Sequence, residues 1–383
     1  MVRLSVTAGG RSRITVVRIH VVRIHVVRIY DKENGDVMAG TPNSSAPAVK
    51  PKRKHVLSGV LAALLMIVAV LGTIARALPA DLQSLPYVPV VVSLTPWFVP
   101  LAVVALLLAL FSNRWFVALI ALACVAAQVW WQAPFFRSQA ALSQDAVTAV
   151  GQAHAVTGDH YARVMTLNVF KGQTDPQAVV DLVRDERVEV LALQETTDAF
   201  VKQLEADGIG DYLPYSQVSS SDGVYGNGLW SAVALDRPVD DEVNSSASFM
   251  PAGTVDMGGV QVRFISVHTT SPQPGYWSQW NRALNELSLM QQKTGTAYVM
   301  MGDFNATYDH AAFRDILGSR FSDATRQAGH GLVFTWPANH TGVPAFAGID
   351  HILIDQGMVA GQVQSKHVAG SDHVALLATL QVA

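Results

Sequence analysis

The chain has 383 residues, half of them hydrophobic, with 27 Lys and Arg against 30 Asp and Glu and a net charge of −3. Its single cysteine, Cys124, excludes an intrachain disulfide, and its length leaves room for one large domain and a second region. Residues 139–383 contain 26 acidic and 13 basic side chains and so carry −13, which is a poor match for duplex DNA, whose binding depends on neutralising phosphates with Lys and Arg.

The first 54 residues are predicted to be a basic tail. A five-residue repeat, Val-Val-Arg-Ile followed by His or Tyr, occupies residues 16–30, and its period matches neither a helix nor a strand. We interpret residues 1–37 as translated upstream sequence, with the true start near Met38; the alternative is a basic arm at a membrane surface. Residues 39–54 are rich in Pro, Ser and Ala and end in a basic cluster, a composition typical of disorder.

Residues 55–137 contain three apolar segments. The first, residues 56–75, has about 20 residues, which at 1.5 Å each span roughly 30 Å, the hydrocarbon thickness of a bilayer. The second covers residues 90–111 and the third, slightly shorter, residues 115–131, with tryptophans near the segment ends, where interfacial aromatic residues belong. We expect a three-span membrane anchor rather than a transporter, because charged residues inside spans usually mark transport sites and these segments have none.

Basic residues predict the orientation of this anchor. The cluster at residues 50–54 should stay in the cytoplasm, and Arg114, between the second and third segments, agrees with that side. Three crossings then place everything after Arg137 outside the cytoplasm. The sequence therefore predicts a multi-pass protein of the cell membrane with an extracytoplasmic C-terminal domain. The alternative is that the apolar segments form a buried helical hairpin of a soluble protein.

The C-terminal domain, residues 161–383, follows a polar, Ala-rich linker at residues 138–160 and alternates predicted strands with predicted helices. Asp175 and Pro176 fit an N-cap followed by proline at the first helical position. The predicted helices cover residues 175–187, 276–293 and 311–317. The predicted strands cover residues 163–169, 188–195, 229–235, 261–268, 298–301, 348–354 and 374–382. This mixture indicates a two-sheet core with helices outside.

Six of the apolar segments bring a carboxylate, amide or imidazole to a segment end or turn. The side chains concerned are Asn168, Glu195, His268, Asp303 with Asn305, Asp350, and Asp372 with His373. Ligand sites in layered α/β domains often lie at such strand ends. Taken singly, each residue also has a purely structural interpretation, such as a capped turn or a hydrogen-bonded strand end. Their repetition at six segments predicts one shared catalytic site.

The ordered motifs resemble the endonuclease/exonuclease/phosphatase superfamily, metal-dependent phosphoesterases that include pancreatic-type deoxyribonucleases, abasic-site endonucleases, bacterial sphingomyelinases and inositol-phosphate phosphatases. The motifs are Leu167-Asn-Val, Gln194-Glu195, Val267-His268, Gly302-Asp-Phe-Asn305, Ile349-Asp-His-Ile352 and Ser371-Asp-His373. They span about residues 160–382, and their ordered combination is specific although no single motif is. The resemblance implies an α/β (α+β) fold, a four-layer αββα sandwich of two mixed sheets flanked by helices.

The resemblance also implies a metal site. Glu195 matches the metal-binding glutamate of the family, with Asn168 and Asp372 near it. Mg²⁺ suits such a site because it takes oxygen ligands and keeps several waters; Mn²⁺ and Ca²⁺ are also compatible. Asn227, in the Gly-rich turn that precedes a predicted strand, is a candidate substrate contact.

The catalytic roles follow from the resemblance in the same way. Asp303 and Asn305 match the pair that orients water and phosphate. Asp350 matches the aspartate that pairs with the histidine at His373, and such a pairing fixes the tautomer and raises the basicity of the imidazole. His268 matches the histidine that contacts phosphate or assists the leaving group.

Two positions depart from the family pattern. Proline usually stands two residues after the last histidine, where this chain has Ala375, and the residue before Ile349 is often basic, where this chain has Gly348. Neither departure removes a catalytic group, and both concern the placement of the substrate.

Together these features predict a membrane-anchored, extracytoplasmic, Mg²⁺-dependent hydrolase of phosphate esters, and among these a phosphodiesterase. Its partners would be a phosphate ester (nucleic acid, phospholipid head group or small phosphodiester) and the lipid bilayer, and no segment indicates a protein partner. The alternative is a catalytically silent, membrane-tethered binding domain with the same fold, against which the complete residue set argues.

Overall fold

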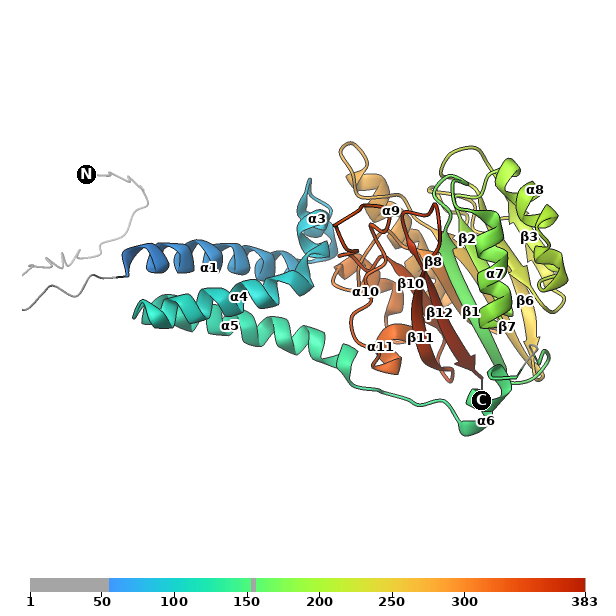
Figure 1. The fold of residues 1–383 in the computed structure, drawn as a ribbon, viewed down its shortest axis with the longest axis horizontal. Helices are drawn as coiled ribbons and strands as arrows, with labels where there is room; N and C mark the ends of the chain where they lie inside the picture. Colours follow the sequence, from blue (N-terminus) through green and yellow to red (C-terminus); the bar gives the residue numbers. More distant parts are fainter. Residues whose placement is uncertain (1–54, 153–155, 383) are drawn as a thin grey trace, which may run out of the picture. The chain divides into compact units, whose positions relative to one another are not determined.

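The structure, a computed structural model, describes residues 55–152 and 156–382 (Figure 1). The repeat and basic tail expected over residues 1–54 lie outside the described residues, as do residues 153–155 of the expected linker.

Three apolar helices dominate the first part of the described chain: α1 (Val56–Ala77), α4 (Thr95–Phe111) and α5 (Trp115–Gln132). Short helices α2 (Ala80–Gln83) and α3 (Val88–Ser93) connect the first two, and a 3₁₀ turn, η1 (Ala133–Phe136), extends the third. Within residues 55–152 and 156–382, only α1 and α5 with its extension have the length and apolar composition needed to cross a membrane, and α4 is shorter. We call residues 55–137 the helical region.

The second apolar segment is not one helix over residues 90–111, as the sequence suggested, but two. Pro96 has no N–H to donate to the carbonyl of Val92, so a continuous helix would lose a hydrogen bond there. The hydroxyl of Thr95 donates to that carbonyl instead, at 2.6 Å. The helix α4 therefore starts afresh at Thr95, with Pro96 in its first turn, where proline is tolerated.

The three long helices meet through small side chains. Their buried clusters consist of Ala62, Ala109 and Ala118, and of Ala69, Ala102 and Cys124. Large apolar side chains point outward instead, for example Leu57 and Phe116, which is 76% exposed. Small residues therefore allow close helix contacts, while the bulky apolar surface faces away from the bundle.

The C-terminal domain contains two six-stranded sheets, with the orders β11-β12-β1-β2-β4-β3 in sheet A and β5-β6-β7-β8-β10-β9 in sheet B. Sheet A consists of β1 (Tyr161–Asn168), β2 (Val190–Gln194), β3 (Tyr215–Ser219), β4 (Asn227–Ser231), β11 (Val359–His367) and β12 (Val374–Gln381). Sheet B consists of β5 (Asp236–Val239), β6 (Ala252–Met257), β7 (Val260–His268), β8 (Ala297–Asp303), β9 (Ser322–Asp323) and β10 (Asp350–Ile354). Sheet A contains the parallel pair β1–β2 and sheet B contains the parallel pair β7–β8, and each pair has antiparallel neighbours. Both sheets are therefore mixed.

Helices cover the outer faces of both sheets (Figure 1). The helices are α6 (Gln144–Val150), α7 (Pro176–Glu186), α8 (Asp198–Ala206), η2 (Ile209–Asp211), α9 (Trp277–Ser288), η3 (Leu289–Gln292), α10 (Ala311–Leu317) and α11 (Ala324–Ala328). Side chains of α7 and α8 pack on sheet A, and those of α9 and α10 pack on sheet B. A third apolar cluster, which includes Val164, Phe264 and Met301, fills the space between the sheets. The expected sandwich of two mixed sheets flanked by helices is confirmed.

The two parallel pairs end at the same edge of the sandwich. Asn168 is the register partner of Gln194 in sheet A, and His268 is the partner of Asp303 in sheet B. The antiparallel strand β10 starts at Asp350, directly opposite Asp303. The register therefore gathers the predicted strand-end residues at one place.

Glycine is required where β8 reaches this edge. A Cβ atom on Gly302 would lie 1.9 Å from the carbonyl oxygen of Val267 on β7. No side chain fits at that distance, so the absence of one allows β7 and β8 to stay paired up to their last residues.

Buried polar groups join the helical region to the C-terminal domain. Arg76, near the end of α1, donates from Nε to Oδ1 of Asp309 at 2.7 Å, and Gln132 donates to the same carboxylate. Oε1 of Gln83 accepts from the N–H of Ala311 at 2.7 Å. Asp309 belongs to the segment that directly follows β8, so these contacts reach the neighbourhood of the strand ends.

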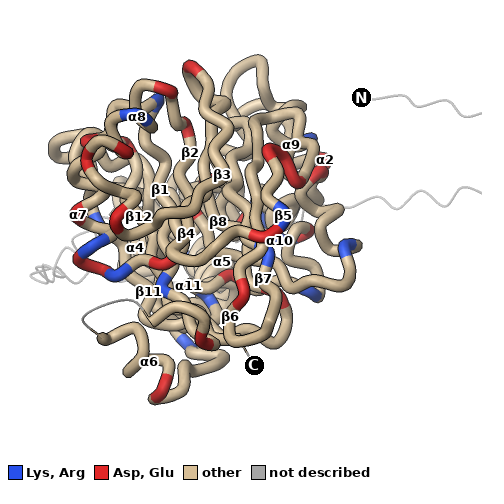
Figure 2. The backbone as a smooth tube through the Cα atoms, turned by 90° about the vertical axis from the view of Figure 1, so that its right-hand side faces the viewer, with Lys and Arg blue, Asp and Glu red and all other residues tan. Residues whose placement is uncertain are grey.

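Figure 2 shows the charge distribution on the C-terminal domain. Acidic positions are spread over its loops and helices, with fewer basic positions among them. This distribution along the backbone agrees with the excess of acidic residues in the second part of the sequence.

Candidate active site

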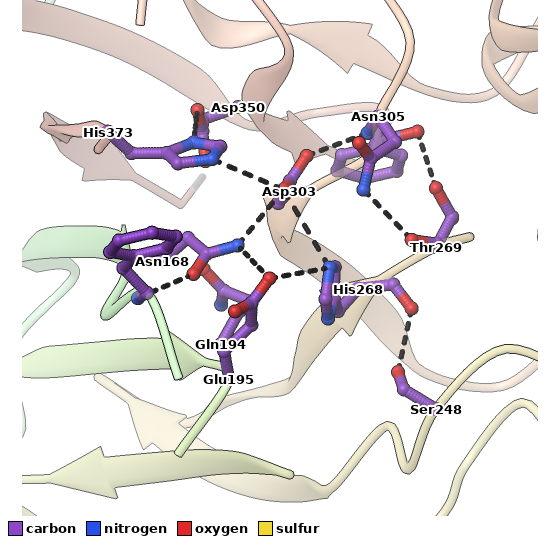
Figure 3. Close-up of polar contacts among 12 residues, drawn as sticks. Asn168, Gln194, Glu195, Ser248, His268, Thr269, Asp303, Asn305, Asp350 and His373 are labelled. Atoms are coloured by element: carbon purple, nitrogen blue, oxygen red, sulfur yellow. Dashed lines mark hydrogen bonds and ion pairs between the residues drawn. The ribbon is translucent and has the colours of Figure 1, made fainter. Parts of the chain in front are cut away.

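Asn168 connects the two sheets at their common edge (Figure 3). Its Nδ2 donates to Oε1 of Glu195 at 3.2 Å and to Oδ2 of Asp303 at 3.1 Å, and its Oδ1 accepts from the N–H of Phe170 at 2.9 Å. The residue is 1% exposed. Asn168 thus turns its amide nitrogen, rather than its oxygen, toward the two carboxylates and holds them side by side.

Backbone strain is concentrated around this edge. Phe170, Lys171, Glu195 and Asn305 have φ angles of 49°, 55°, 59° and 46°, a region that non-glycine residues rarely adopt. The conformation serves the site, because the N–H of Lys171 donates to Oε2 of Glu195 at 2.9 Å and the N–H of Asn305 donates to Oδ1 of Asp303 at 2.8 Å. The turns therefore aim backbone donors at the site carboxylates.

His373 and Asp350 form a hydrogen-bonded pair. Nδ1 of His373 lies 2.8 Å from Oδ2 of Asp350, and its Nε2 lies 3.7 Å from Oδ2 of Asp303. The backbone N–H of His373 donates to Oγ of Ser371 at 2.9 Å, and that hydroxyl donates to the carbonyl of Asn168 at 2.7 Å. Asp350 therefore holds the imidazole through Nδ1, Ser371 holds the backbone of His373, and Nε2 faces the centre of the site.

His268 approaches the same centre from sheet B. Its Nε2 is 3.8 Å from both Oε1 of Glu195 and Oδ2 of Asp303. Among the described residues, its buried Nδ1 has no hydrogen-bond partner. His268 and His373 therefore flank Asp303 at distances beyond a direct hydrogen bond.

Burial and neighbouring charges shift the pKa values of the central groups. Burial raises the pKa of Asp303 to about 6, opposed by His373 and reinforced by Asp350. Burial also disfavours the protonated form of His373, but the negative charges of Asp350 and Asp303 outweigh it and raise the pKa of His373 to about 10. The site thus combines a proton-accepting carboxylate with a cationic imidazole.

Asn305 is held beside Asp303 by hydrogen bonds with Thr269 and Trp280. Its Nδ2 donates to the carbonyl of Thr269 at 2.9 Å, and its own carbonyl accepts from Nε1 of Trp280 on α9 at 2.9 Å. Sequence reasoning missed Thr269, which directly follows His268, because a backbone carbonyl leaves no signature in the residue type.

Asn227 lies at the start of β4 but forms no hydrogen bond with the central cluster among the described residues. Its Nδ2 donates to Oγ of Ser248 at 3.0 Å and to the carbonyl of Phe249. Ser248 in turn donates to the carbonyl of His268 at 2.7 Å. Oδ1 of Asn227 is buried without a partner in the described part of the chain, and the residue reaches the site through this loop.

The site offers two places for a divalent cation. Asp303, Asp350 and His373 each bring one ligand atom to within 4.8 Å of the others, but a hydrogen bond of 2.8 Å already joins the last two. Asp372 offers the second place, because its buried Oδ1 has no hydrogen-bond partner within the described ranges, although Nε2 of His373 lies 3.9 Å away. Burial raises the pKa of Asp372. The charge of His373 opposes this shift, and the negative charge of Glu195 reinforces it. An orphaned carboxylate oxygen near a second carboxylate fits a cation with oxygen ligands.

A protein-family scan matches residues 165–373, more than half of the chain, to the Endonuclease/Exonuclease/phosphatase family. A search of curated proteins found no match.

Several solved structures are similar to the C-terminal domain. Truncated TDP2 from Caenorhabditis elegans has a TM-score of 0.47 at 17% identity, with 58% of this chain and 98% of that chain covered. D. rerio TDP2, complexed with a single-strand DNA product, has a TM-score of 0.48 at 17% identity, with 58% and 100% covered. An AP endonuclease from Archaeoglobus fulgidus has a TM-score of 0.47 at 18% identity, with 57% and 98% covered. At these identities the likenesses carry no information about substrate. From the extent of the sequence match, the chain belongs to the Endonuclease/Exonuclease/phosphatase family.

Proposed function

We propose that this protein is a membrane-anchored, extracytoplasmic, Mg²⁺-dependent hydrolase of phosphate esters, and among these a phosphodiesterase. One observation carries the proposal: a buried amide, Asn168, holds Glu195 and Asp303 side by side while His268 and His373 face the same carboxylate. A silent binding domain has no need to keep these charged groups together inside the protein, since burying them is costly.

In the proposed reaction the oxygen of a water attacks phosphorus and the bond from phosphorus to the ester oxygen breaks. The water proton passes to Asp303, whose Oδ1 is held by the N–H of Asn305 and whose Oδ2 is held by Asn168. Nε2 of His268 and Nε2 of His373 lie 3.8 and 3.7 Å from Oδ2 of Asp303, too far for a hydrogen bond to that oxygen. Both nitrogens therefore donate to phosphate oxygens or to the departing oxygen in the proposed reaction.

Glu195 and Asp372 would hold the metal ion, with Asn168 fixing the position of Glu195. When bound, Mg²⁺ supplies positive charge that stabilises the negative charge developing around phosphorus. Asp303 accepts the water proton, and His268 and His373 provide the hydrogen-bond donors.

The helical region supports the membrane part of the proposal. Its helices bury small side chains and expose large apolar ones, with Phe116 at 76% exposure. A water-soluble bundle fills its interior with the large residues, whereas helices in lipid have no reason to hide them. The basic cluster before α1 favours a cytoplasmic N-terminal side and, with three proposed crossings, a C-terminal domain on the outside.

A substrate panel tests the proposal. The full chain in detergent would be assayed with DNA, RNA, sphingomyelin, phosphatidylinositol and inositol phosphates, in Mg²⁺ and in EDTA. We expect hydrolysis of a phosphodiester that requires Mg²⁺, loss of that activity in Glu195→Ala, and full activity in Glu205→Ala, which removes an exposed glutamate on α8. Full hydrolysis in EDTA would contradict the metal dependence, and no hydrolysis of any substrate would favour the silent binding domain.

A further inference from the structure

A cavity of about 830 Å³ lies where the helical region meets the C-terminal domain, away from the catalytic cluster. The side chains of α5, including Leu122, Val129 and Trp130, form one wall, and Tyr308 belongs to the opposite wall. Four arginines also line it: Arg76, Arg137, Arg314 and Arg326. No residue of the proposed active site takes part, so the cavity needs an explanation of its own.

Three of these arginines form no ion pair within the described residues. Arg76 is paired with Asp309 at 2.7 Å, whereas Arg137, Arg314 and Arg326 form no ion pair with any described residue. Nη1 of Arg314 donates to the backbone carbonyls of Tyr308 and Asp309. Its burial, together with the positive charge of Arg76, lowers the pKa of Arg314 to about 10. The described lining of the cavity therefore carries positive charge from its arginines and includes no carboxylate.

Aromatic rings hold two of the guanidinium groups in place. The guanidinium of Arg326 lies 4.4 Å from the ring centre of Tyr308 and 5.3 Å from that of Phe135, and that of Arg76 lies 4.7 Å from Trp131. Such stacking orients a guanidinium without neutralising its charge. The N–H groups at the rim of the stacked planes stay available to oxygen acceptors such as phosphate.

The apolar wall decides which anion fits. Leu122 is 51% exposed and Trp130 is 79% exposed, and both belong to α5, one of the two helices with the length and composition of a membrane span. A free phosphate needs no apolar surface beside it. A phospholipid does, because its phosphate reaches the arginines while its acyl chains lie along the helix.

We propose that this cavity binds the phosphate-bearing head group of an anionic phospholipid. The inference rests on the membrane anchoring proposed above, but not on the proposed hydrolysis. Arg137 lies in the segment after α5, Arg314 on α10 and Arg326 on α11. A lipid phosphate shared among them therefore holds the C-terminal domain against the helical region.

Lipid titration of the full chain in detergent, followed by native mass spectrometry, tests this site. The probes are phosphatidylglycerol and phosphatidylcholine with identical acyl chains. We expect the intact chain to prefer phosphatidylglycerol by at least tenfold. Arg137→Gln combined with Arg326→Gln should reduce affinity for phosphatidylglycerol roughly thirtyfold, since each basic residue near an anionic lipid contributes on the order of a factor of five.

Two control variants separate the site from general charge and from folding. Arg184→Gln with Arg237→Gln makes the same change in charge at exposed positions elsewhere, with side chains 49% and 64% exposed, and should keep the preference. Arg137→Lys with Arg326→Lys keeps the positive charge at the site and should restore most of the affinity.

Three outcomes would overturn the proposal. They are equal affinity for the two lipids, a preference unchanged by the Gln pair, and displacement of the lipid by inorganic phosphate at equal concentration, which would mean a free phosphate site. Extraction of membranes with alkaline carbonate tests the membrane anchoring separately from the lipid site. Release of the chain by carbonate would reject the anchoring itself, whereas retention without a lipid preference would reject only the lipid site.

Discussion

At the scale of single residues, the site depends on partners that orient each reactive group. Asp350 fixes one ring nitrogen of His373, Asn168 fixes Glu195 and Asp303, and backbone donors complete the arrangement. Side chains that act through such pairs lose more than their own contribution when one member is removed.

The His373–Asp350 pair makes a direct prediction. His373→Ala should reduce turnover by roughly 10²- to 10⁴-fold, the usual contribution of a group that transfers or donates a proton. Asp350→Asn should cost a similar or smaller factor, because it removes the negative charge that keeps the imidazole protonated but leaves the ring in place. Steady-state kinetics of the double variant should give a value close to that of His373→Ala alone. Losses that multiply would show that the two residues act separately.

Glu189, at the opposite end of β2 from the site, predicts a pH dependence of stability. Burial raises the pKa of its carboxyl from 4.5 to about 8, even though the N–H of Arg163 donates to Oε1 at 3.1 Å. Between these two pH values the unfolded chain has released the proton and the folded chain has kept it. The free energy of unfolding therefore falls as the pH rises from about 4.5 to about 8, by a few kcal/mol in order of magnitude.

Glu189→Gln removes this titration and keeps an acceptor for the N–H of Arg163. The variant should melt at a higher temperature than the parent chain at pH 8, while the two should differ little near pH 4.5. Thermal unfolding followed by tryptophan fluorescence measures both. Glu205→Gln, at an exposed position, serves as the control and should leave the pH profile unchanged. A melting temperature for Glu189→Gln below that of the parent at pH 8 would contradict the assignment.

The site residues that could be predicted from the sequence are those that stand at the ends of buried strands. Asp303 and His268 are examples. An apolar run that stops at a polar residue can be recognised in the sequence itself, and two parallel strands end at the same edge of a sheet. Contacts made by backbone atoms, such as the carbonyl of Thr269 or the N–H of Lys171, depend on turn conformation and leave no such pattern. Asn227 was visible as a residue near a turn, but its attachment to Ser248 was not.

At the scale of elements, the sequence predicted the central strands and missed the marginal ones. The strands β3, β5, β9 and β11 lie at sheet edges. β3 exposes or half-exposes all of its residues, β5 contains a proline, and β11 has an irregular register, so none shows the buried run or the alternation expected of a strand. The inner strand β6, which includes Gly253 and Asp256, also lacks a continuous apolar run.

Gly302 makes the prediction that belongs to the strands β7 and β8. Gly302→Ala places a methyl group against the carbonyl of Val267, 1.9 Å from the ideal Cβ position, so the two strands must separate beside His268 and Asp303. We expect a loss of about 3 kcal/mol or more in the free energy of unfolding, beyond the usual cost of an overpacked methyl group, and a loss of hydrolysis.

Gly210→Ala is the matched control, because no atom lies within 4 Å of the added Cβ. Chemical denaturation of both variants measures the difference. A Gly302→Ala chain as stable as the Gly210→Ala chain would show that β7 and β8 approach less closely than described.

At the scale of the whole molecule, the orientation of the chain across the membrane is the main prediction. A phosphatase reporter fused to the C-terminus should be active outside the cytoplasm, because the proposed anchor crosses the membrane three times after the basic cluster at residues 50–54, with the shorter helix α4 as the second crossing. A fluorescent protein that matures only in the cytoplasm should stay dark at that position. The same reporters inserted after Asn113, between α4 and α5, should give the opposite pattern. Identical patterns at the two positions would mean an even number of crossings between them.

The buried ion pair between Arg76 and Asp309 has a consequence for how a substrate is found. A domain on a loose tether explores a hemisphere above its attachment point, whereas the contacts of Arg76 and Gln132 with Asp309 restrict how far the C-terminal domain can move from its helices. For such an enzyme in a membrane, encounters with a substrate in the same bilayer happen by lateral diffusion within one plane. Turnover then follows the number of substrate molecules per unit area, and the volume of the surrounding solution has no influence on it.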